Sequence, residues 1–156
     1  MQQSVSDETE AIVALWSRLA EAHAGRDADG IASAYAADAV IYDLAPPLGR
    51  RGMPRAEVAA WLATWDGPIT IDAADRQLTV AGAIAYATAL TRMRGRQQGV
   101  DQDLWYRTTT CLERRPEGWR IVHEHTSVPF HMDGSYRAAI DLRPGDIAAG
   151  QDGDRA

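Results

Sequence analysis

The sequence predicts an α+β protein in which three N-terminal helices precede four long strands of a curved antiparallel sheet. Apolar residues recur at helical spacing up to Trp65, whereas alternating or continuous apolar runs follow from Ile69 onward. The length of 156 residues fits one domain, which we place at 1–130, with 131–156 as a C-terminal extension. The extension loses the periodic pattern after His131, and its end, GQDGDRA, is expected to be disordered.

The first predicted helix begins near Asp7 and ends at Gly25. Asp7 and Glu10 fit a capping box, in which side chains of the first turn bind backbone N–H groups that lack a partner in the helix. The apolar face of this helix consists of residues at helical spacing: Ile12, Leu15, Trp16 and Leu19.

Two shorter helices are expected before Ile69. One begins after Asp27 or Asp29 and presents one apolar face, formed by Ile31, Ala34 and Tyr35. The other begins at Pro54, because the first N–H groups of a helix have no partner within it and proline, which lacks an N–H, is therefore tolerated there. This helix ends at Gly67-Pro68. Its apolar stripe is formed by Val58, Trp61, Leu62 and Trp65.

A short strand is expected at 39–44, where AVIYDL is followed by Pro46-Pro47. The four long strands are expected to cover residues 69–80, 83–93, 104–114 and 119–128. Gly82 and RPEG provide tight turns, and the polar segment GRQQGVDQ at 95–102 is expected to form a loop. Three helices of this length can cover a curved sheet but cannot fill its concavity, so the sequence predicts a pocket between them.

The composition is unusual in its alanine and lysine content. Alanine accounts for 28 of the residues, so large aliphatic side chains are few, and four alanines are expected to leave space beside the sheet: Ala83, Ala85, Ala87 and Ala89. There are 16 arginines and no lysine, which excludes Schiff-base chemistry, a lysine general base and a phosphate-loop lysine. Any acid/base chemistry must therefore use carboxylates, histidines or hydroxyls.

Charge and cysteine content exclude several other classes. The net charge of −6 and the pI near 5.1 argue against a nucleic-acid partner, which needs a concentrated basic surface. A single cysteine, Cys111, excludes an intrachain disulfide and a multi-cysteine metal site. The N-terminus is too polar for a signal peptide, and no apolar run approaches the roughly 20 residues of a membrane span. We therefore expect a cytoplasmic protein with no membrane partner.

Two segments of the sequence resemble a known superfamily. The run AYAADAVIYDLAPPLGRRG at 34–52 resembles the helix-to-strand region of nuclear transport factor 2-like proteins, where ketosteroid isomerases carry their catalytic aspartate. GWRIVHEHTSVPF at 118–130 resembles SnoaL-like domains and the hub domain of calcium/calmodulin-dependent protein kinase. The resemblance covers about residues 7–130 and implies a cone-shaped barrel with an internal pocket, a homodimer, and no cofactor. It implies no single function, because the fold hosts isomerases, dehydratases, cyclases, epoxide hydrolases and non-catalytic adaptors.

At individual positions this sequence differs from both the isomerases and the kinase hub domains. The isomerases' general base falls at Asp43, but the donors of their oxyanion hole fall at Leu19 and near Thr110. Loss of one such donor costs about 100-fold, so steroid isomerisation by that mechanism is not expected. The arginines of the kinase hub pocket fall near Thr88, Thr110 and Thr126, so an acidic hub ligand is not expected at those positions.

Asp43 is the first candidate catalytic residue. It follows Tyr42 and precedes Leu44, and desolvation by apolar neighbours makes a carboxylate a stronger base. The alternative is a structural role in which Asp43 caps the following Pro-Pro turn. The resemblance favours the catalytic role.

Glu124 and the two flanking histidines provide further candidates. The resemblance places Val122, Glu124 and Thr126 on the cavity side of the last strand. On that side, Glu124 could act with Asp43 as an acid/base pair. The alternative, which the sequence favours, is that Glu124 forms an ion pair with Arg107 or Arg120. His123 and His125 share the opposite face. They could chelate a metal if Asp43 or His131 supplied a third ligand, but we predict no metal and keep His125 as a secondary acid/base candidate.

The predicted function is cofactor-independent acid/base chemistry on a small, apolar, carbonyl-containing molecule, with isomerase, dehydratase and cyclase as the reaction types. The catalytic candidates are Asp43, Glu124 and His125. The residues expected to bind the substrate are Tyr35, Trp61, Trp65, Thr88, Tyr106, Thr110 and Thr126. The helical spacing of Trp61 and Trp65 favours the alternative of a structural role in the core for these two. The alternative is a non-catalytic small-molecule-binding or dimerisation domain of the same fold, which gains support if both carboxylates are ion-paired to arginines.

Overall fold

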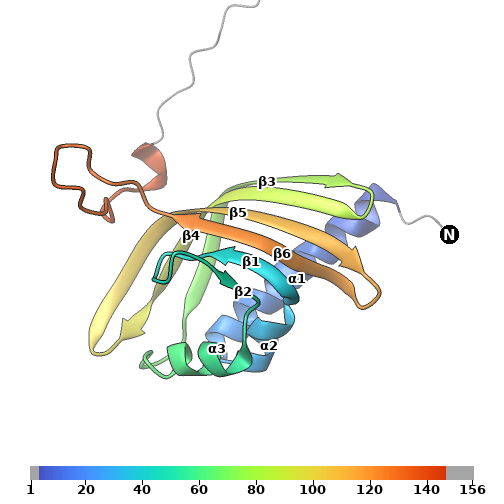
Figure 1. The fold of residues 1–156 in the computed structure, drawn as a ribbon, viewed down its shortest axis with the longest axis horizontal. Helices are drawn as coiled ribbons and strands as arrows, with labels where there is room; N and C mark the ends of the chain where they lie inside the picture. The colour runs from blue at the N-terminus through green and yellow to red at the C-terminus, as the bar shows by residue number, and fades with distance from the viewer. Residues whose placement is uncertain (1–3, 147–156) are drawn as a thin grey trace, which may run out of the picture.

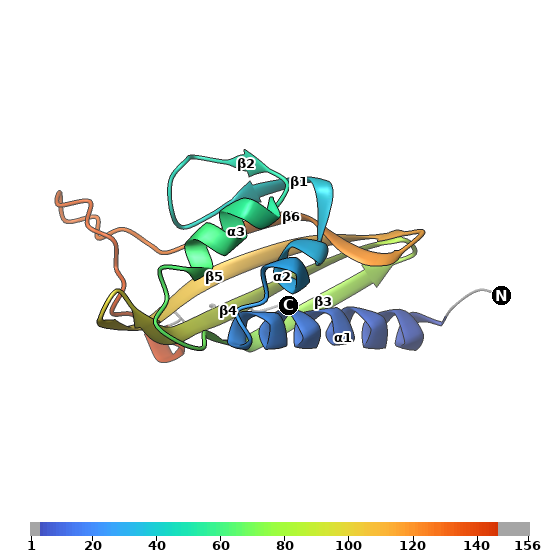
Figure 2. The same ribbon diagram turned by 90° about the horizontal axis from the view of Figure 1, so that it is seen from below.

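Three helices begin the chain in the computed structural model, which describes residues 4–146. They are α1 (Val5–Ala24), α2 (Ala28–Ser33) and α3 (Arg55–Leu62), and all lie on the same side of the sheet (Figures 1 and 2). The capping box of α1 is formed by Ser4 and Asp7, one turn earlier than expected, and Asp27 caps α2. No helix in this described range is long and apolar enough to span a membrane.

The strands form one six-stranded sheet in the order β2-β1-β6-β5-β4-β3. Their bounds are β1 (Tyr35–Tyr42), β2 (Arg50–Arg51), β3 (Thr70–Ala81), β4 (Ile84–Gln97), β5 (Val100–Arg115) and β6 (Gly118–Ser127). The predicted α+β class is confirmed, but the sheet is mixed because β1 runs parallel to β6. The sheet curves around the helices without closing into a barrel, since β2 and β3 are its two edges (Figure 1).

The prediction of a loop at 95–102 is wrong. β4 and β5 continue through this segment as hairpin arms, and only Gln98 and Gly99 connect them. The arms are polar because cross-strand ion pairs, not burial, stabilise them: Arg92 binds Asp103 and Arg96 binds Asp101, each at 2.7 Å. Cross-strand ion pairs therefore stabilise β4 and β5 beyond the part of the sheet that the core covers.

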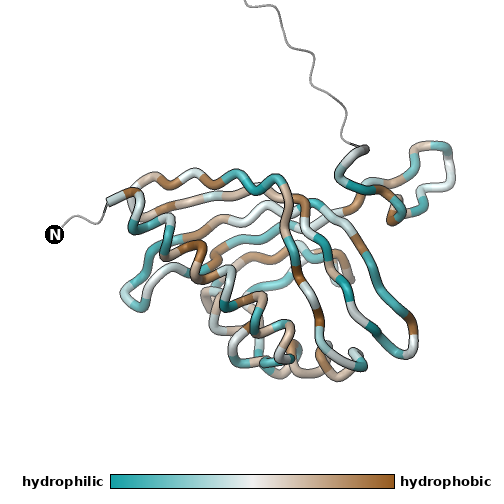
Figure 3. Tube along the Cα trace, turned by 180° about the vertical axis from the view of Figure 1, so that it is seen from behind, coloured by the Kyte–Doolittle hydropathy of each residue, from teal (hydrophilic) through white to brown (hydrophobic). Residues whose placement is uncertain are grey.

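The core lies between the helices and the concave face of the sheet. Ile12 and Leu15 of α1 pack with Leu112, Trp119 and Ile121 of β5 and β6. A second cluster joins α2 and α3 to the start of β3 and contains Ile31, Val58, Leu62, Trp65 and Ile69. Hydrophobic and hydrophilic residues alternate along the helices and strands (Figure 3), as expected of elements with one buried face.

In the described part of the chain beyond β6, up to residue 146, there is little regular structure. Phe130 forms an isolated bridge with Ala138, and a short 3-10 helix, η1 (Pro144–Asp146), follows. The predicted disordered end, GQDGDRA, lies outside the described residues.

A buried glutamate fixes the start of α1 to the sheet. Glu8 is 5% exposed, accepts a hydrogen bond from Trp119 Nε1 at 2.6 Å, and is ion-paired with Arg114. We expect Glu8→Ala to lower the free energy of unfolding by about 3 kcal/mol, because it leaves the Trp119 N–H buried without an acceptor and removes the ion pair. Urea denaturation measures this loss. Glu10→Ala, an exposed neighbour on the same helix, is the control; an equal loss in both variants would contradict the assigned role of Glu8.

Candidate active site

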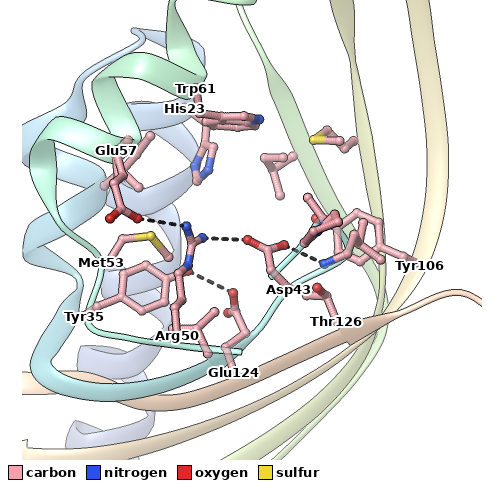
Figure 4. A pocket seen from close by; sticks show the side chains of 18 of the residues that line it. His23, Tyr35, Asp43, Arg50, Met53, Glu57, Trp61, Tyr106, Glu124 and Thr126 are labelled. Atoms are coloured by element: carbon pink, nitrogen blue, oxygen red, sulfur yellow. Dashed lines mark hydrogen bonds and ion pairs between the residues drawn. The ribbon is translucent and has the colours of Figure 1, made fainter. Parts of the chain in front are cut away.

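A cavity of about 380 Å³ lies between the helices and the concave face of the sheet (Figure 4). Its apolar lining comes from α2, α3, β3 and β4 (Ile31, Val58, Trp61, Ile71 and Met93) and from β1 and the segment after it (Ile41, Leu44, Ala45, Pro46, Pro47 and Met53). A smaller compartment of about 130 Å³ extends from it between α1 and β3–β5. The two spaces share part of their lining, namely His23, Tyr35, Ile71, Tyr106, Glu124 and Thr126. The polar groups of the cavity gather where the two compartments meet.

Glu124 is the central polar residue of this junction. Strand register places it beside Thr110 of β5 and Ile41 of β1. Tyr35 donates its hydroxyl to Oε1 at 2.9 Å, and Thr110 donates to Oε2 at 3.4 Å. Within residues 4–146 Glu124 forms no ion pair, so the expected pairing with Arg107 or Arg120 is not formed.

The surroundings of Glu124 favour its protonated form. Burial is the largest effect, and it raises the pKa of Glu124 from 4.5 to about 7 although the hydrogen bond from Tyr35 lowers it. The negative charge of Asp43 raises the pKa further, whereas the hydrogen bond from Thr110 and the positive charge of Arg50 lower it. A carboxyl group with this pKa can both accept and return a proton at neutral pH.

Two tyrosines face the same junction. Burial, together with the charge of Glu124, raises the pKa of Tyr35 and of Tyr106 above the ordinary value of 10.0. Both hydroxyls therefore remain protonated at neutral pH and act as donors. The Tyr35 hydroxyl is used by Glu124, whereas the Tyr106 hydroxyl has no hydrogen-bond partner among the described residues. Tyr106 can therefore donate to a bound molecule.

Asp43 lies at the rim of the cavity, just beyond the end of β1. Its Oδ2 is 2.6 Å from Nη2 of Arg50, and its Oδ1 accepts the backbone N–H of Leu44 at 2.8 Å. Arg50 also approaches Glu57 of α3 at 3.6 Å, so one guanidinium joins two carboxylates across the rim (Figure 4). The Asp43 side chain is 41% exposed, which places it in contact with solvent as well as with the cavity. The apolar burial expected from its sequence neighbours is thus absent.

His23 is a site residue that the sequence analysis missed. It projects from α1 toward the cavity (Figure 4), lies edge-on to Trp61 with ring centroids 6.0 Å apart, and places Nδ1 2.7 Å from Leu19 O. Burial lowers the pKa of His23, so the imidazole is neutral at neutral pH. With the Nδ1 proton donated to Leu19 O, Nε2 is left as an acceptor. The signal was its spacing: His23 continues the apolar stripe of α1 one turn after Leu19.

The remaining predicted residues divide into two groups. Tyr35, Trp61, Tyr106 and Thr126 line the main cavity, and Thr110 lines the smaller compartment. Three residues lie off the lining: Trp65, Thr88 and His125.

Packing explains these three exceptions. Trp65 is 2% exposed and packs in the core, edge-on to Trp61. Thr88 alternates with Ala87, which lines the smaller compartment, so it faces the outer side of the sheet. His125 packs against the ring of Tyr42, as does His123. In the described part of the chain no group of three or more His, Cys, Asp or Glu residues could hold a metal ion.

The chain belongs to the SnoaL-like domain family. The sequence profile of that family matches residues 12–131, a segment that contains most of α1, all of α2 and α3, all six strands and every residue of the junction. A comparison with curated protein sequences gave no match.

Solved structures support the same fold. A nuclear transport factor 2-like protein of unknown function from Pseudomonas putida KT2440 is 31% identical, with a TM-score of 0.78 over 90% of this chain and 99% of that one. A protein from Streptomyces avermitilis, assigned provisionally as a dehydratase of the same superfamily, is 17% identical, with a TM-score of 0.68 over 80% and 97% of the chains. A protein from Shewanella frigidimarina, assigned provisionally as a ketosteroid isomerase, is 22% identical, with a TM-score of 0.58 over 75% and 94%. At these identities the last two show the shared fold alone.

Proposed function

We propose that this protein is a cofactor-independent enzyme that transfers a proton on a small, largely apolar, carbonyl-containing molecule. The reaction types that fit are isomerisation, dehydration and cyclisation. The observation that carries the proposal is Glu124, a carboxyl group enclosed by hydroxyls, without an ion-pair partner in the described chain, and with a pKa of about 7. Such a group is poised for acid/base chemistry at neutral pH, whereas a structural glutamate is ordinarily ionised and paired.

The proposed steps use three residues of the junction. Ionised Glu124 removes a proton from the carbon next to the substrate carbonyl, and the electrons of that C–H bond move toward the carbonyl oxygen. Tyr106 donates a hydrogen bond to this oxygen as it gains negative charge. The protonated Glu124 then returns its proton to another carbon, which completes isomerisation, or to a departing hydroxyl, which leaves as water. Tyr35 positions the carboxyl group by holding Oε1.

The provisional assignments of two structural relatives are compatible with this chemistry. Dehydration and ketosteroid isomerisation both begin with proton transfer near a carbonyl or hydroxyl group. The apolar lining of the cavity supports a substrate that is itself mostly apolar. The homodimer and the cytoplasmic location expected from the sequence remain predictions.

The ion pair between Asp43 and Arg50 favours a second candidate, a non-catalytic binding domain. In that case the rim network would only close the cavity around a ligand. Hydrogen–deuterium exchange separates the candidates, because a general base catalyses exchange of protons next to a carbonyl even when the natural product is unidentified. Cyclohexanone, indanone and benzylacetone in D₂O, followed by proton NMR, provide suitable probes. Exchange at the uncatalysed rate for all of them would contradict the proposal.

The role of Asp43 is tested by Asp43→Asn. We expect exchange at neutral pH to change by less than about 10-fold, because Glu124 is the proposed base, whereas loss of the base itself costs about 100-fold or more. We also expect the pKa of Glu124 to fall, because the charge of Asp43 raises it, and Arg50→Gln should raise it for the opposite reason. Carbon-detected NMR titration measures both shifts. A loss of 100-fold or more in folded Asp43→Asn would identify Asp43 as the base, as the resemblance to ketosteroid isomerases implies.

A further inference from the structure

A bulge in β3 turns an arginine toward the smaller compartment. The register between β3 and β4 shifts between Ala74 and Gln77, and Asp75 within this step has a φ of 51°. The extra residue changes which side chains face inward, so that Arg76 shares the concave side with Leu78. Without it, strand alternation from Ile71 would place Arg76 on the outer side.

Arg76 is held there by an aromatic ring and not by an acid. Its Cζ lies 4.1 Å from the ring centroid of Trp16 on α1. Stacking uses the face of the guanidinium group and leaves its in-plane N–H donors available. Among the described residues Arg76 has no hydrogen bond or ion pair, whereas Arg50, the arginine of the main cavity, binds two carboxylates. Arg76 remains exposed to solvent on one side, and its partial burial lowers its pKa.

The space between Arg76 and Glu124 is kept open by small side chains. β4 and β5 separate β3 from β6, so the two backbones are about 14 Å apart, which is three strand spacings. The inward residues of those two strands in this region are Ala87, Ala89, Thr108 and Thr110. This floor accounts for the compartment of about 130 Å³ and continues into the main cavity at Glu124.

We propose that Arg76 binds a carboxylate of the substrate, so that the molecule extends from Arg76 along the alanine and threonine floor to Glu124. This inference rests on the proposed function and makes it more specific: the substrate is a small apolar carbonyl compound that carries an acid group at one end. The planar guanidinium matches a carboxylate with two parallel hydrogen bonds, and the stack on Trp16 fixes its orientation. Arg76 is a binding residue and takes no part in the proton transfer.

Matched ligands test the proposal without a known substrate. Hydrocinnamate and its neutral amide have the same shape and differ in charge, and isothermal titration calorimetry gives a Kd for each. We expect the folded wild-type protein to bind the carboxylate about 10-fold more tightly than the amide, as a charge-assisted hydrogen bond predicts. In Arg76→Gln the preference should disappear while the amide binds as before. Arg107→Gln, an exposed arginine off both lining surfaces, should retain the preference.

Several outcomes would overturn the proposal. Equal binding of the two probes by the wild-type protein, no binding of either, or an unchanged preference in Arg76→Gln would each do so. Loss of the preference in Arg50→Gln alone would assign the anion to the rim. Glu124→Gln should keep the preference, so a failure of the catalytic proposal appears in the exchange assay and a failure of this one appears in calorimetry.

Discussion

Glu124→Gln is expected to reduce hydrogen–deuterium exchange on the ketone probes by about a hundred- to ten-thousand-fold. The amide has nearly the shape of the protonated acid: its oxygen can accept from Tyr35, and its NH₂ group can donate to the Thr110 hydroxyl. The fold and the cavity should therefore persist while the carboxyl group that accepts and returns the proton is lost. Proton NMR in D₂O gives the rates.

Glu10→Gln is the matched control for this variant. It makes the same chemical change at an exposed position on α1, and its exchange rate should equal that of the wild-type protein. An active, folded Glu124→Gln would contradict the proton transfer assigned to Glu124. Equal losses in both variants would show that the effect is not specific to the junction.

The second large effect concerns stability and its dependence on pH. The pKa of Glu124 is about 7 in the folded protein and 4.5 as the ordinary value, so the folded state binds a proton that the unfolded state releases between these pH values. The stability that this group contributes is therefore present below about pH 4.5 and is lost as pH rises through about 7. Glutamine does not titrate and removes this loss. Relative to the wild-type protein, Glu124→Gln should gain about 2 kcal/mol in unfolding free energy between roughly pH 5 and 8.

Urea denaturation of both proteins across this range measures the gain. Other titrating groups, including His23, are present in both proteins and cancel in the difference. Glu10→Gln should show no such dependence. A pH-independent difference between Glu124→Gln and the wild-type protein would mean that the carboxyl group of Glu124 is not desolvated.

The sequence predicted the fold class because helical spacing and strand alternation are local signals. The apolar stripe of α1 and the long strands β3 to β6 follow from these signals. The parallel pairing of β1 with β6 could not be predicted, since it joins residues such as Ile41 and Glu124 that are distant in the chain. The polar hairpin arms were mistaken for a loop because cross-strand ion pairs, such as Arg92 with Asp103, replace the apolar alternation that marks a buried strand.

The site was predicted in part for similar reasons. Alternation along β6 placed Glu124 and Thr126 on one side, and the resemblance chose the side that lines the cavity. The partner of Asp43 was missed because Arg50 lies across a loop, and the position of Arg76 was missed because a bulge reverses the alternation of β3. Both depend on backbone geometry that a sequence pattern does not contain.

The pKa of Glu124 decides whether this residue can transfer a proton at neutral pH. Carbon-detected NMR of protein labelled at the glutamate carboxyl carbon, with Glu124→Gln used to assign the resonance, follows this group through a pH titration. We expect a midpoint near pH 7, well above the ordinary value of 4.5. A midpoint at the ordinary value would show an ionised, solvated carboxylate and would contradict the proposed role of Glu124 in proton transfer.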